Sequence, residues 1–466
     1  EDLCTRKDKD GAVSINALER FLGDWGVSRA LPLPQIARET WLESVGVVGS
    51  GPAGLSFAYQ KARRASPVTS KEQDETPGGM LRHAIPDYRL PREVLDTEIE
   101  RLLGMGVALE CNVSIGVDIS LEELRERHAL LFLGLGAQAG RTLGIPGEHG
   151  PGVVSGIDFL RQRKDAPTKL DGKRVLVIGG GNTAMDAARS ALRDGADVTL
   201  VYRRSENEMP ASAEEVRDAR AEGVKFRFLS APTRIIRNGG GLQKVEVQGM
   251  RLGKPDRNRR WKPVPVEGDI DTLPADLVIA AIAQMPDWQG LDAVAAARDW
   301  FDTRADGKLT DDVWAGGDDR SPGIAGAAIA QGRFAAEAAH AELRGLPPPE
   351  ADIRKPVEAG SVRADYYDEG KRLEPQHCGT KWRFYPDKEV VATITSEEAL
   401  AEASRCMSCG LCFDCEQCFM YCNGAGFTHV TESRPGNYFV LALVACEGCG
   451  KCIEVCPCGY LEARDE

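Results

Sequence analysis

One short plan occurs twice in this chain of 466 residues, and it limits the folds available. Residues 45–55 read VGVVGSGPAGL, and residues 173–192 read KRVLVIGGGNTAMDAARSAL. Each stretch is an apolar run, then closely spaced glycines, then a helix-like segment, which predicts a buried strand, a tight turn and a helix. Two such units predict an α/β chain with two nucleotide-binding domains built on parallel sheets.

The first glycine group has the G-x-G-x-x-G spacing of a dinucleotide-binding turn. Gly49 permits the tight turn, Gly51 lets the backbone approach a pyrophosphate, and Gly54 lets the helix lie close to the strand. The N-terminus of that helix would then stabilise the anion. We therefore expect a dinucleotide at this turn.

An acidic residue follows the first turn at the distance where a ribose needs a hydrogen-bond acceptor. Glu72 ends the segment PVTSKE, and we expect it to accept from ribose hydroxyls. Ser70 and Lys71 make the preceding strand unusually polar, so Asp74 and Glu75 are kept as substitutes. A second glycine pair, in PGGM at 77–80, is expected to approach the same ligand.

The second glycine group reads G-x-G-x-x-A, with Gly179, Gly181 and Ala184. The next strand, DVTLVY, runs into Arg203 and Arg204, where an NAD-specific site often carries an acid. Two guanidiniums can bind a 2′-phosphate through charge-assisted hydrogen bonds. The pattern favours NADP(H), with NAD(H) left open; a solvated basic turn is the alternative.

Three further segments carry a family resemblance: LLFLGLGAQAGRTLGIPGE (130–148), ADLVIAAIAQMPD (275–287) and VWAGGDDRSPGIAGAAIAQGRFAA (313–336). With both glycine motifs, residues 1 to about 345 resemble the small subunit of glutamate synthase and its relatives. The resemblance implies FAD at the first motif and NAD(P)H at the second, in an inserted domain. It also implies that Gly317 and Asp318 contact FAD and that the helix from Ala325 approaches the isoalloxazine. Ala283 stands where the family has a glycine.

Motifs and resemblance together give one set of expected cofactor contacts. They are Gly49, Gly51, Pro52, Ala53, Gly54, Glu72, Gly78, Gly79, Met80, Leu81, Gly136, Gly179, Gly181, Asn182, Thr183, Ala184, Arg203, Arg204, Gly317, Asp318 and Ala325. No catalytic acid–base residue is predicted, because the cofactors supply the chemistry. A disulfide reductase of similar fold needs a redox-active cysteine pair, whereas this core holds Cys111 alone, which we interpret as structural.

Of the fourteen cysteines, eleven fall between Cys406 and Cys458. Their spacing repeats C-x2-C-x2-C-x3-C, the bacterial ferredoxin pattern, in which the fourth cysteine of each run binds the other cluster. One 4Fe–4S cluster is therefore expected on Cys412, Cys415, Cys418 and Cys456, and a second on Cys446, Cys449, Cys452 and Cys422.

Other assignments of the cysteines stay open. Cys406 and Cys409 continue the upstream run at the same interval, so they could replace later members of the first ligand set. The same cysteines could bind zinc in place of an iron–sulfur cluster, or they could form disulfides and bind no metal. By resemblance, Cys4 is the last cysteine of an N-terminal segment that holds a third cluster. Cys378 and Cys458 are unassigned.

The predicted order of parts follows from these motifs. A helical, iron–sulfur N-terminal segment, with a helix over 14–25, occupies 1–40. An FAD domain at 41–150 and 290–345 encloses an NAD(P)H domain at 151–289, giving two Rossmann-like domains of disulfide-oxidoreductase type. An extended linker at 346–400 leads to an α+β ferredoxin domain with two clusters at 401–466.

Composition narrows the function classes. The net charge of −13 argues against a nucleic-acid partner, and no apolar run approaches the length that spans a bilayer. We expect a cytoplasmic homodimer. Because the chain starts at Glu1 and not Met, we also expect residues upstream of it.

The complete arrangement resembles the iron–sulfur flavoprotein associated with dissimilatory sulfite reductase. That resemblance implies an NAD(P)H:acceptor oxidoreductase that exchanges electrons with dissimilatory sulfite reductase and its sulfur-carrier protein in sulfur metabolism. One alternative is a general NAD(P)H:ferredoxin-type oxidoreductase, or a donor to another enzyme like the glutamate synthase small subunit. Another is a non-enzymatic iron–sulfur electron-transfer or sensor subunit.

Overall fold

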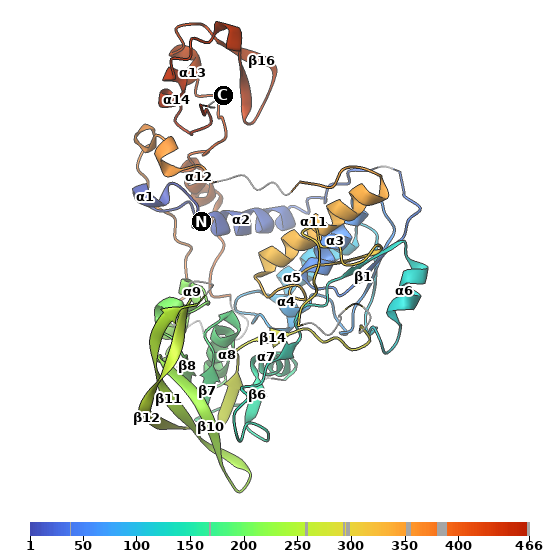
Figure 1. Cartoon of the computed structure of the whole chain (residues 1–466), viewed down its shortest axis with the longest axis vertical. Helices are drawn as coiled ribbons and strands as arrows, with labels where there is room; N and C mark the ends of the chain where they lie inside the picture. The colour runs from blue at the N-terminus through green and yellow to red at the C-terminus, as the bar shows by residue number, and fades with distance from the viewer. Residues whose placement is uncertain are drawn as a thin grey trace. The chain divides into compact units, whose positions relative to one another are not determined.

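The computed structural model describes residues 1–466 except 38, 167–168, 257–259, 292–293, 295–298, 351–355, 380–388 and 464–466 (Figure 1). The chain forms two compact units. The smaller unit comprises Glu1–Leu31, Ala351–His377 and Val391–Glu466, and the larger comprises Pro32–Glu350 and Cys378–Val390. The sequence-based division did not anticipate that the N-terminal segment and the cysteine-rich tail belong to one unit.

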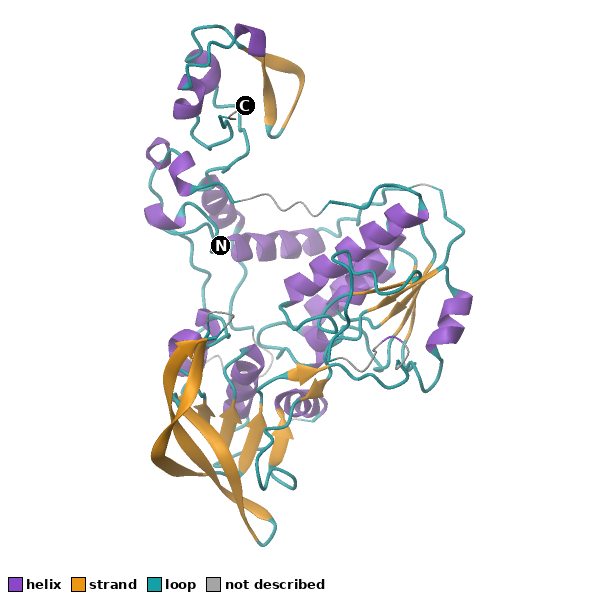
Figure 2. Cartoon of the chain, viewed as in Figure 1, coloured by secondary structure: helices purple, strands orange, loops and turns teal. Residues whose placement is uncertain are grey.

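The larger unit contains two parallel sheets of five strands each, drawn in orange in Figure 2. The first has the order β15-β4-β1-β2-β3. Its strands are β1 (Val45–Val48), β2 (Val68–Lys71), β3 (Val107–Glu110), β4 (Leu130–Leu133) and β15 (Val313–Ala315). Every residue of β1 and β4 is buried, as expected where helices cover both faces of a parallel sheet.

Five helices pack around this first sheet, and α3 follows the glycine turn as the motif predicts. They are α3 (Pro52–Ala62), α4 (Met80–His83), α5 (Arg92–Leu103), α6 (Leu121–Arg127) and α11 (Ala325–Leu343). Helices α3 and α11 lie close together because Gly332 faces the backbone of Ala53. A Cβ atom at Gly332 would lie 2.2 Å from the Ala53 carbonyl oxygen. Beneath α3, the rings of Phe57 and Phe132 stack with centroids 4.3 Å apart.

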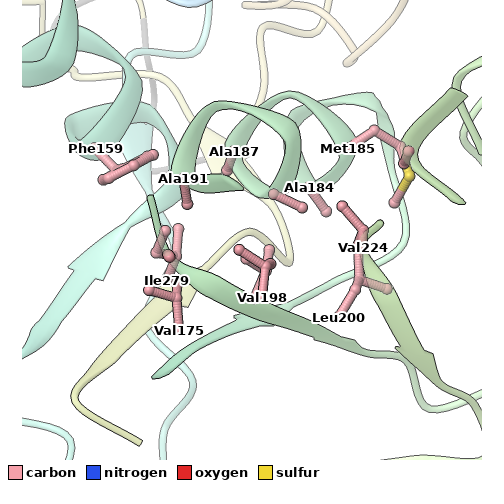
Figure 3. Packing of buried hydrophobic residues seen from close by; sticks show 14 of the residues in the cluster. Phe159, Val175, Ala184, Met185, Ala187, Ala191, Val198, Leu200, Val224 and Ile279 are labelled. Atoms are coloured by element: carbon pink, nitrogen blue, oxygen red, sulfur yellow. The ribbon is translucent and has the colours of Figure 1, made fainter. Parts of the chain in front are cut away.

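The second sheet repeats the plan with the order β6-β13-β7-β8-β9. Its strands are β6 (Val153–Ser155), β7 (Arg174–Ile178), β8 (Asp197–Val201), β9 (Lys225–Arg227) and β13 (Leu277–Ala280), with helices α7 (Gly156–Asp165), α8 (Asn182–Arg193) and α9 (Ala213–Glu222). In Figure 3 the small side chains of Ala184, Ala187 and Ala191 on α8 face Val198 and Leu200 of β8. Alanine on this face lets α8 lie close to the sheet. The two parallel sheets confirm the predicted α/β class.

Two antiparallel elements join or extend this second domain. Residues 230–274, which carry none of the sequence motifs, form a sheet of β10 (Ser230–Asn238), β11 (Gly241–Pro255) and β12 (Trp261–Pro274). Its long twisted hairpin is visible in Figure 2. The short strands β5 (Ala139–Gly140) and β14 (Gln284–Met285) pair where the chain passes between the two sheets. Ala283, beside β14, is not among the residues of positive φ, so this position does not require the glycine of the family pattern.

The smaller unit is built from short elements. These are α1 (Lys7–Asp10), α2 (Ile15–Ser28), single 3₁₀ turns η2 (Ala359–Ser361) and η3 (Ala364–Tyr366), α12 (Ser396–Ser404), α13 (Gln417–Met420), the antiparallel pair β16 (Phe427–Arg434) and β17 (Asn437–Leu441), η4 (Leu443–Ala445) and α14 (Lys451–Val455). Helix α2 confirms the helix predicted over 14–25. Residues 346–400 contain two 3₁₀ turns and the start of α12, so they are not a uniformly extended linker. No helix in the described ranges combines the length and the apolar character needed to cross a bilayer.

A buried charge cluster fastens the N-terminal segment of the smaller unit to the end of α12. The guanidinium of Arg6 donates to Asp10 at 2.7 Å and to the Arg405 carbonyl at 2.5 Å. The Arg405 guanidinium donates to Asp10 at 2.9 Å and to Glu402 at 2.6 Å. The hydrogen bond from Arg6 holds the pKa of Asp10 well below its usual range, and Arg405 lowers it further.

A second buried cluster joins α8 to α9 in the larger unit. Arg189 is only 1% exposed, and its guanidinium donates to Glu222 at 2.7 and 3.0 Å, to Asp218 at 3.3 Å and to Glu215. Burial by itself would raise the pKa of Glu222, but the hydrogen bonds from Arg189 and Arg193 outweigh burial and lower it. The arginine therefore balances acidic groups that burial would otherwise make costly.

We expect Arg189→Met to lower the free energy of unfolding by about 3 kcal/mol, because it removes one buried cation from three carboxylates, of which Glu222 keeps Arg193 and Glu215 keeps Arg89. Urea unfolding followed by circular dichroism measures this loss. Arg217→Met, on the exposed side of α9, is the matched control and should change stability by about 0.5 kcal/mol or less. Equal unfolding midpoints for the two variants would contradict this role of Arg189.

Candidate functional site

The first glycine turn joins β1 to α3 as predicted. Gly49 has φ +90°, and a Cβ atom there would meet the Gly134 carbonyl oxygen at 2.3 Å. A Cβ atom on Gly54 would lie 1.9 Å from the Gly49 carbonyl oxygen. A Cβ atom on Gly51, by contrast, has nothing within 4 Å. Two glycines thus allow backbone contact within the fold, while Gly51 faces open space where a ligand can approach.

Glu72 lies at the carboxyl end of β2, directly beside this turn. Its side chain is 5% exposed and accepts hydrogen bonds from the backbone nitrogen of Ser50 at 2.8 Å and from its hydroxyl at 2.5 Å. Strand β2 forms despite its polar residues because it lies between β1 and β3, where Lys71 pairs with Glu110. Asp74, the substitute candidate, is instead paired with His83 at 3.2 Å.

A cavity opens at the carboxyl ends of β1, β2, β4 and β15, with about 1080 Å³ of space counted out to its mouth. Ligands of open parallel sheets bind at this edge. Ten predicted contacts line the cavity: Gly49, Gly51, Pro52, Ala53, Glu72, Gly79, Met80, Gly136, Gly317 and Asp318. The structure therefore brings together residues that are up to 269 positions apart in the chain, from Gly49 to Asp318.

Four other predicted contacts do not line this cavity. Gly54 lies within α3 against Gly49, and the backbone nitrogen of Gly78 donates to the Ser50 carbonyl at 3.1 Å. Leu81 packs in an apolar cluster with Leu55, and Ala325 is the first residue of α11. These four residues lie in or beside the elements that carry the lining residues, so they support the cavity walls and do not face the cavity.

The cavity also has walls that the sequence motifs did not reveal. Residues 113–117, after β3, and residues 287–291, after β14, contribute to its lining. Gly116 and Gly290 meet at this wall, where a Cβ on Gly116 would lie 2.3 Å from the Gly290 Cα. Both glycines have positive φ, at +83° and +73°. In the sequence, the presence of glycine at these two positions was the signal that could have pointed to this wall.

Two adjacent aspartates follow β15. Asp318 lines the cavity, and its Oδ1 accepts from the Gly323 backbone at 2.9 Å. Asp319 is fully buried and accepts from the Leu135 backbone nitrogen at 3.0 Å. Burial raises the pKa of Asp319 well above its ordinary value. Asp319 thus joins the loops after β4 and β15 behind the cavity wall.

The second glycine turn joins β7 to α8. A Cβ atom on Gly179 would lie 2.1 Å from the Ala281 carbonyl oxygen, and Gly181 is the N-cap of α8. Thr183, in the first turn of α8, accepts a hydrogen bond from the Gln284 side chain at 3.0 Å. The Asn182 side chain accepts from the Ser212 backbone nitrogen at 3.1 Å. The turn is therefore fixed from both sides.

Helices α3 and α8, like several other helices of the described chain, begin without a side-chain cap, and their first N–H groups lie at the glycine turns. Their N-caps are Gly51 and Gly181, and neither helix has a side-chain cap hydrogen bond. Helices α6, α9 and α12 begin instead with serine or threonine caps. Uncapped N-terminal N–H groups and the helix dipole favour a phosphate, so both turns fit nucleotide cofactors.

The two arginines after β8 differ in exposure. Arg203 is exposed, as a phosphate ligand should be. Arg204 is only 6% exposed, and its Nε donates to the Trp261 carbonyl at 2.7 Å. Arg204 is thus engaged through its Nε with the first residue of β12, whereas Arg203 is open to solvent. The role of the two arginines as phosphate ligands stays a prediction.

Two thiols of the tail have raised pKa values, and other tail cysteines contribute to each shift. Burial raises the pKa of Cys418, to about 11, with Cys415, Cys412 and Cys456 also acting on this thiol. Burial also raises the pKa of Cys452, with Cys446 and Cys449 as its neighbours. Cys456, from the downstream run, is thus among the charges that act on Cys418. The assignment of Cys456 to the upstream cluster stays a prediction from ferredoxin spacing.

The smaller unit places the remaining cysteines of interest near these groups. The Thr5 hydroxyl lies 2.7 Å from the Cys409 sulfur, so Cys4 and Cys409 belong to adjoining segments. Cys458 is buried with its sulfur 3.8 Å from that of Cys456. None of the fourteen cysteines is in a disulfide.

Within the described ranges, no three Cys, His, Asp or Glu side chains are placed closely enough to hold one metal ion. A cluster of four irons binds each thiolate to a different iron, so its ligands lie further apart than those of a single ion. The tail cysteines match such a site in residue type and in their spacing along the sequence.

These features define an α/β protein with two nucleotide-type turns and a cavity at the first. Residues 43–332 match the pyridine nucleotide-disulphide oxidoreductase family, and the chain belongs to that family. It is therefore an NAD(P)H oxidoreductase with the fold that binds FAD and a nicotinamide nucleotide. Membership of an enzyme family sets aside the non-enzymatic alternative.

Two relatives show which members of this family the chain is similar to. The chain is 42% identical over 318 residues to the β subunit of the NADP(+)-dependent formate dehydrogenase of Moorella thermoacetica, covering 63% of this chain and 45% of the relative. It is 36% identical over 313 residues to the NADPH glutamate synthase small chain of Halomonas elongata, covering 64% of each. The chain thus spans less than two thirds of either relative, and its resemblance to glutamate synthase small subunits is supported.

A solved structure agrees with this fold. Mycobacterium tuberculosis FprA in complex with NADPH aligns with a TM-score of 0.56 at 20% identity, covering 66% of this chain and 87% of FprA. The similarity shows a shared fold over that part of the chain.

Glu72→Gln should weaken FAD binding about tenfold, because an amide cannot accept hydrogen bonds with both of its terminal atoms. Flavin content after dialysis and fluorescence titration of the apoprotein measure the change. Glu75→Gln, an exposed residue of the same loop, is the control and should retain flavin as the wild type does. Equal flavin retention in both variants would contradict the role assigned to Glu72.

Proposed function

We propose that this chain is an NADPH:acceptor oxidoreductase that passes electrons through FAD to iron–sulfur clusters. The cavity at the first glycine turn carries the proposal, because ten residues expected to contact FAD line it together. The relatives named for NADPH or NADP(+) support NADPH as the nucleotide. Bound flavin exchanges a hydride with the nicotinamide and single electrons with the clusters.

The chain's own residues have binding and positioning roles in this proposal. The N-termini of α3 and α8 would stabilise the two pyrophosphates, and Glu72, held by the Ser50 backbone nitrogen, would accept from the ribose of the flavin nucleotide. Gln284 holds Thr183 at the second turn, and the β5–β14 pair connects the two nucleotide domains. No side chain has to transfer a proton to the substrate.

Two 4Fe–4S clusters are proposed on the two cysteine groups. Cys412, Cys415, Cys418 and Cys456 would hold one, and Cys422, Cys446, Cys449 and Cys452 the other. The neighbours that act on Cys418 support the crossing of Cys456 to the upstream run.

A third cluster is proposed near the N-terminal segment, with Cys4, Cys406 and Cys409 among its ligands. The contact between Thr5 and Cys409 and the hydrogen bond from Arg6 to the Arg405 carbonyl support placing these cysteines together. On this proposal, Cys406 and Cys409 are not members of the first ferredoxin set, which removes the ambiguity of register.

Dissimilatory sulfite reductase and its sulfur-carrier protein are proposed as partners of a cytoplasmic homodimer, on the resemblance of the whole arrangement. A general NADPH:ferredoxin-type oxidoreductase, or a donor to another enzyme, is the second candidate, favoured by the formate dehydrogenase relative. NADPH-dependent sulfite reduction in a mixture with purified sulfite reductase supports the first candidate. A rate equal to that without the chain favours the second.

Anaerobically purified protein should contain FAD and about eight irons in the two ferredoxin-type clusters, with further iron at the third site. Cys412→Ser and Cys446→Ser should each lower iron content by about four, because each removes a ligand of one cluster. Iron analysis and absorption spectra measure the loss. Cys111→Ser, outside both groups, should keep the wild-type iron content.

Zinc in place of iron would overturn the proposed relay. So would equal iron content in Cys412→Ser, Cys446→Ser and Cys111→Ser.

A further inference from the structure

Three arginines lie near one another at the end of β8 and the start of β12, the second strand of the hairpin β11–β12. Arg203 and Arg204 follow β8, and Arg260 directly precedes β12. The sequence motif places only the first two near the nucleotide, because Arg260 is 57 positions from Arg203. The fold brings the third guanidinium into the same region.

Arg204 fixes the hairpin to the end of β8. Its buried Nε donates to the carbonyl of Trp261 at 2.7 Å, and its own carbonyl accepts from the Leu229 backbone nitrogen at 3.1 Å. Arg260, the residue before Trp261, is thereby held at the end of β8. Its backbone is constrained further by Asp256, whose nitrogen donates to the Arg260 carbonyl at 2.8 Å and whose Oδ1 accepts from the Arg260 nitrogen at 3.0 Å.

The acidic groups of this region have other partners. Glu206 pairs with Arg220 at 2.7 Å, and Asp271 pairs with Arg227 at 2.8 Å. Glu208 accepts hydrogen bonds from Ser205. Glu206 and Asp271 are therefore paired with arginines other than Arg203, and Asp256 accepts from the backbone nitrogen of Arg260.

The environment of Arg203 is positively charged. Partial burial lowers the pKa of Arg203, and the charges of Arg204 and Arg260 lower it further. Like charges held near one another are unfavourable until an anion lies between them. This end of the second strand is also where the adenosine ribose of a dinucleotide lies in such folds.

We propose that Arg203 and Arg260 together bind the 2′-phosphate of NADPH, with Arg204 as the positioning residue that holds the hairpin in place. Two guanidiniums from different strands suit a dianionic phosphate, to which each can donate charge-assisted hydrogen bonds. The hairpin thus has a role in nucleotide specificity that its sequence does not reveal. The inference rests on the proposed use of NADPH.

Calorimetric titration of the purified full chain with adenosine 2′,5′-bisphosphate and with 5′-ADP isolates the phosphate contact from electron transfer. Arg260→Gln and Arg203→Gln should each weaken binding of the bisphosphate about tenfold and leave 5′-ADP binding within about twofold of the wild type. The KM for NADPH should rise correspondingly, with kcat and the KM for NADH unchanged. Arg251→Gln, an exposed arginine on β11 of the same hairpin, is the matched control for loss of one positive charge.

Arg260→Gln that binds the bisphosphate as tightly as Arg251→Gln would overturn the inference. So would equal weakening of both adenosine ligands, which indicates a general effect on the site. A wild-type chain that binds both ligands equally would refute NADPH preference itself. Wild-type preference for the bisphosphate with no change in Arg260→Gln refutes only the part assigned to Arg260.

Discussion

Close backbone contact at the glycine turns is the constraint on which the larger unit depends. Gly54 lies against the Gly49 carbonyl, and Gly179 lies against the Ala281 carbonyl. Side chains at these positions would push α3 and α8 away from their strands and displace their N-termini. Because those N-termini have no side-chain caps, the same geometry that closes the fold leaves N–H groups for the phosphates.

The smaller unit depends on buried charge more than on a large apolar core. Arg6, Asp10, Glu402 and Arg405 join the N-terminal segment to the end of α12, directly before the first cysteine of the tail. The Tyr367 hydroxyl donates to the Met407 carbonyl at 2.8 Å, between Cys406 and Cys409. The Gly410 nitrogen donates to the Cys458 carbonyl at 2.7 Å. These hydrogen bonds join the N-terminal segment, the segment around Tyr367 and the cysteine-rich tail within one unit.

Local sequence predicted the features that depend on neighbouring residues, and missed those that depend on distant segments. The strand–turn–helix units, helix α2 and the place of Glu72 follow from local pattern. The polar strand β2 still forms because its position inside a parallel sheet outweighs its weak propensity. The burial of Arg204 could not be predicted, because the covering hairpin at 230–274 carries no motif. The cavity wall from 287–291 likewise comes from a segment far from either glycine turn.

An anaerobic reductive titration with NADPH distinguishes an electron relay from a simple flavoprotein, because it counts the electrons that the chain accepts. A relay takes up about four electrons for the flavin and two ferredoxin-type clusters, and more if a third cluster is reduced, with reduced clusters visible by electron paramagnetic resonance. Uptake that stops at about two electrons, with bleached flavin and clusters still oxidised, would contradict a relay from NADPH through flavin to iron–sulfur clusters.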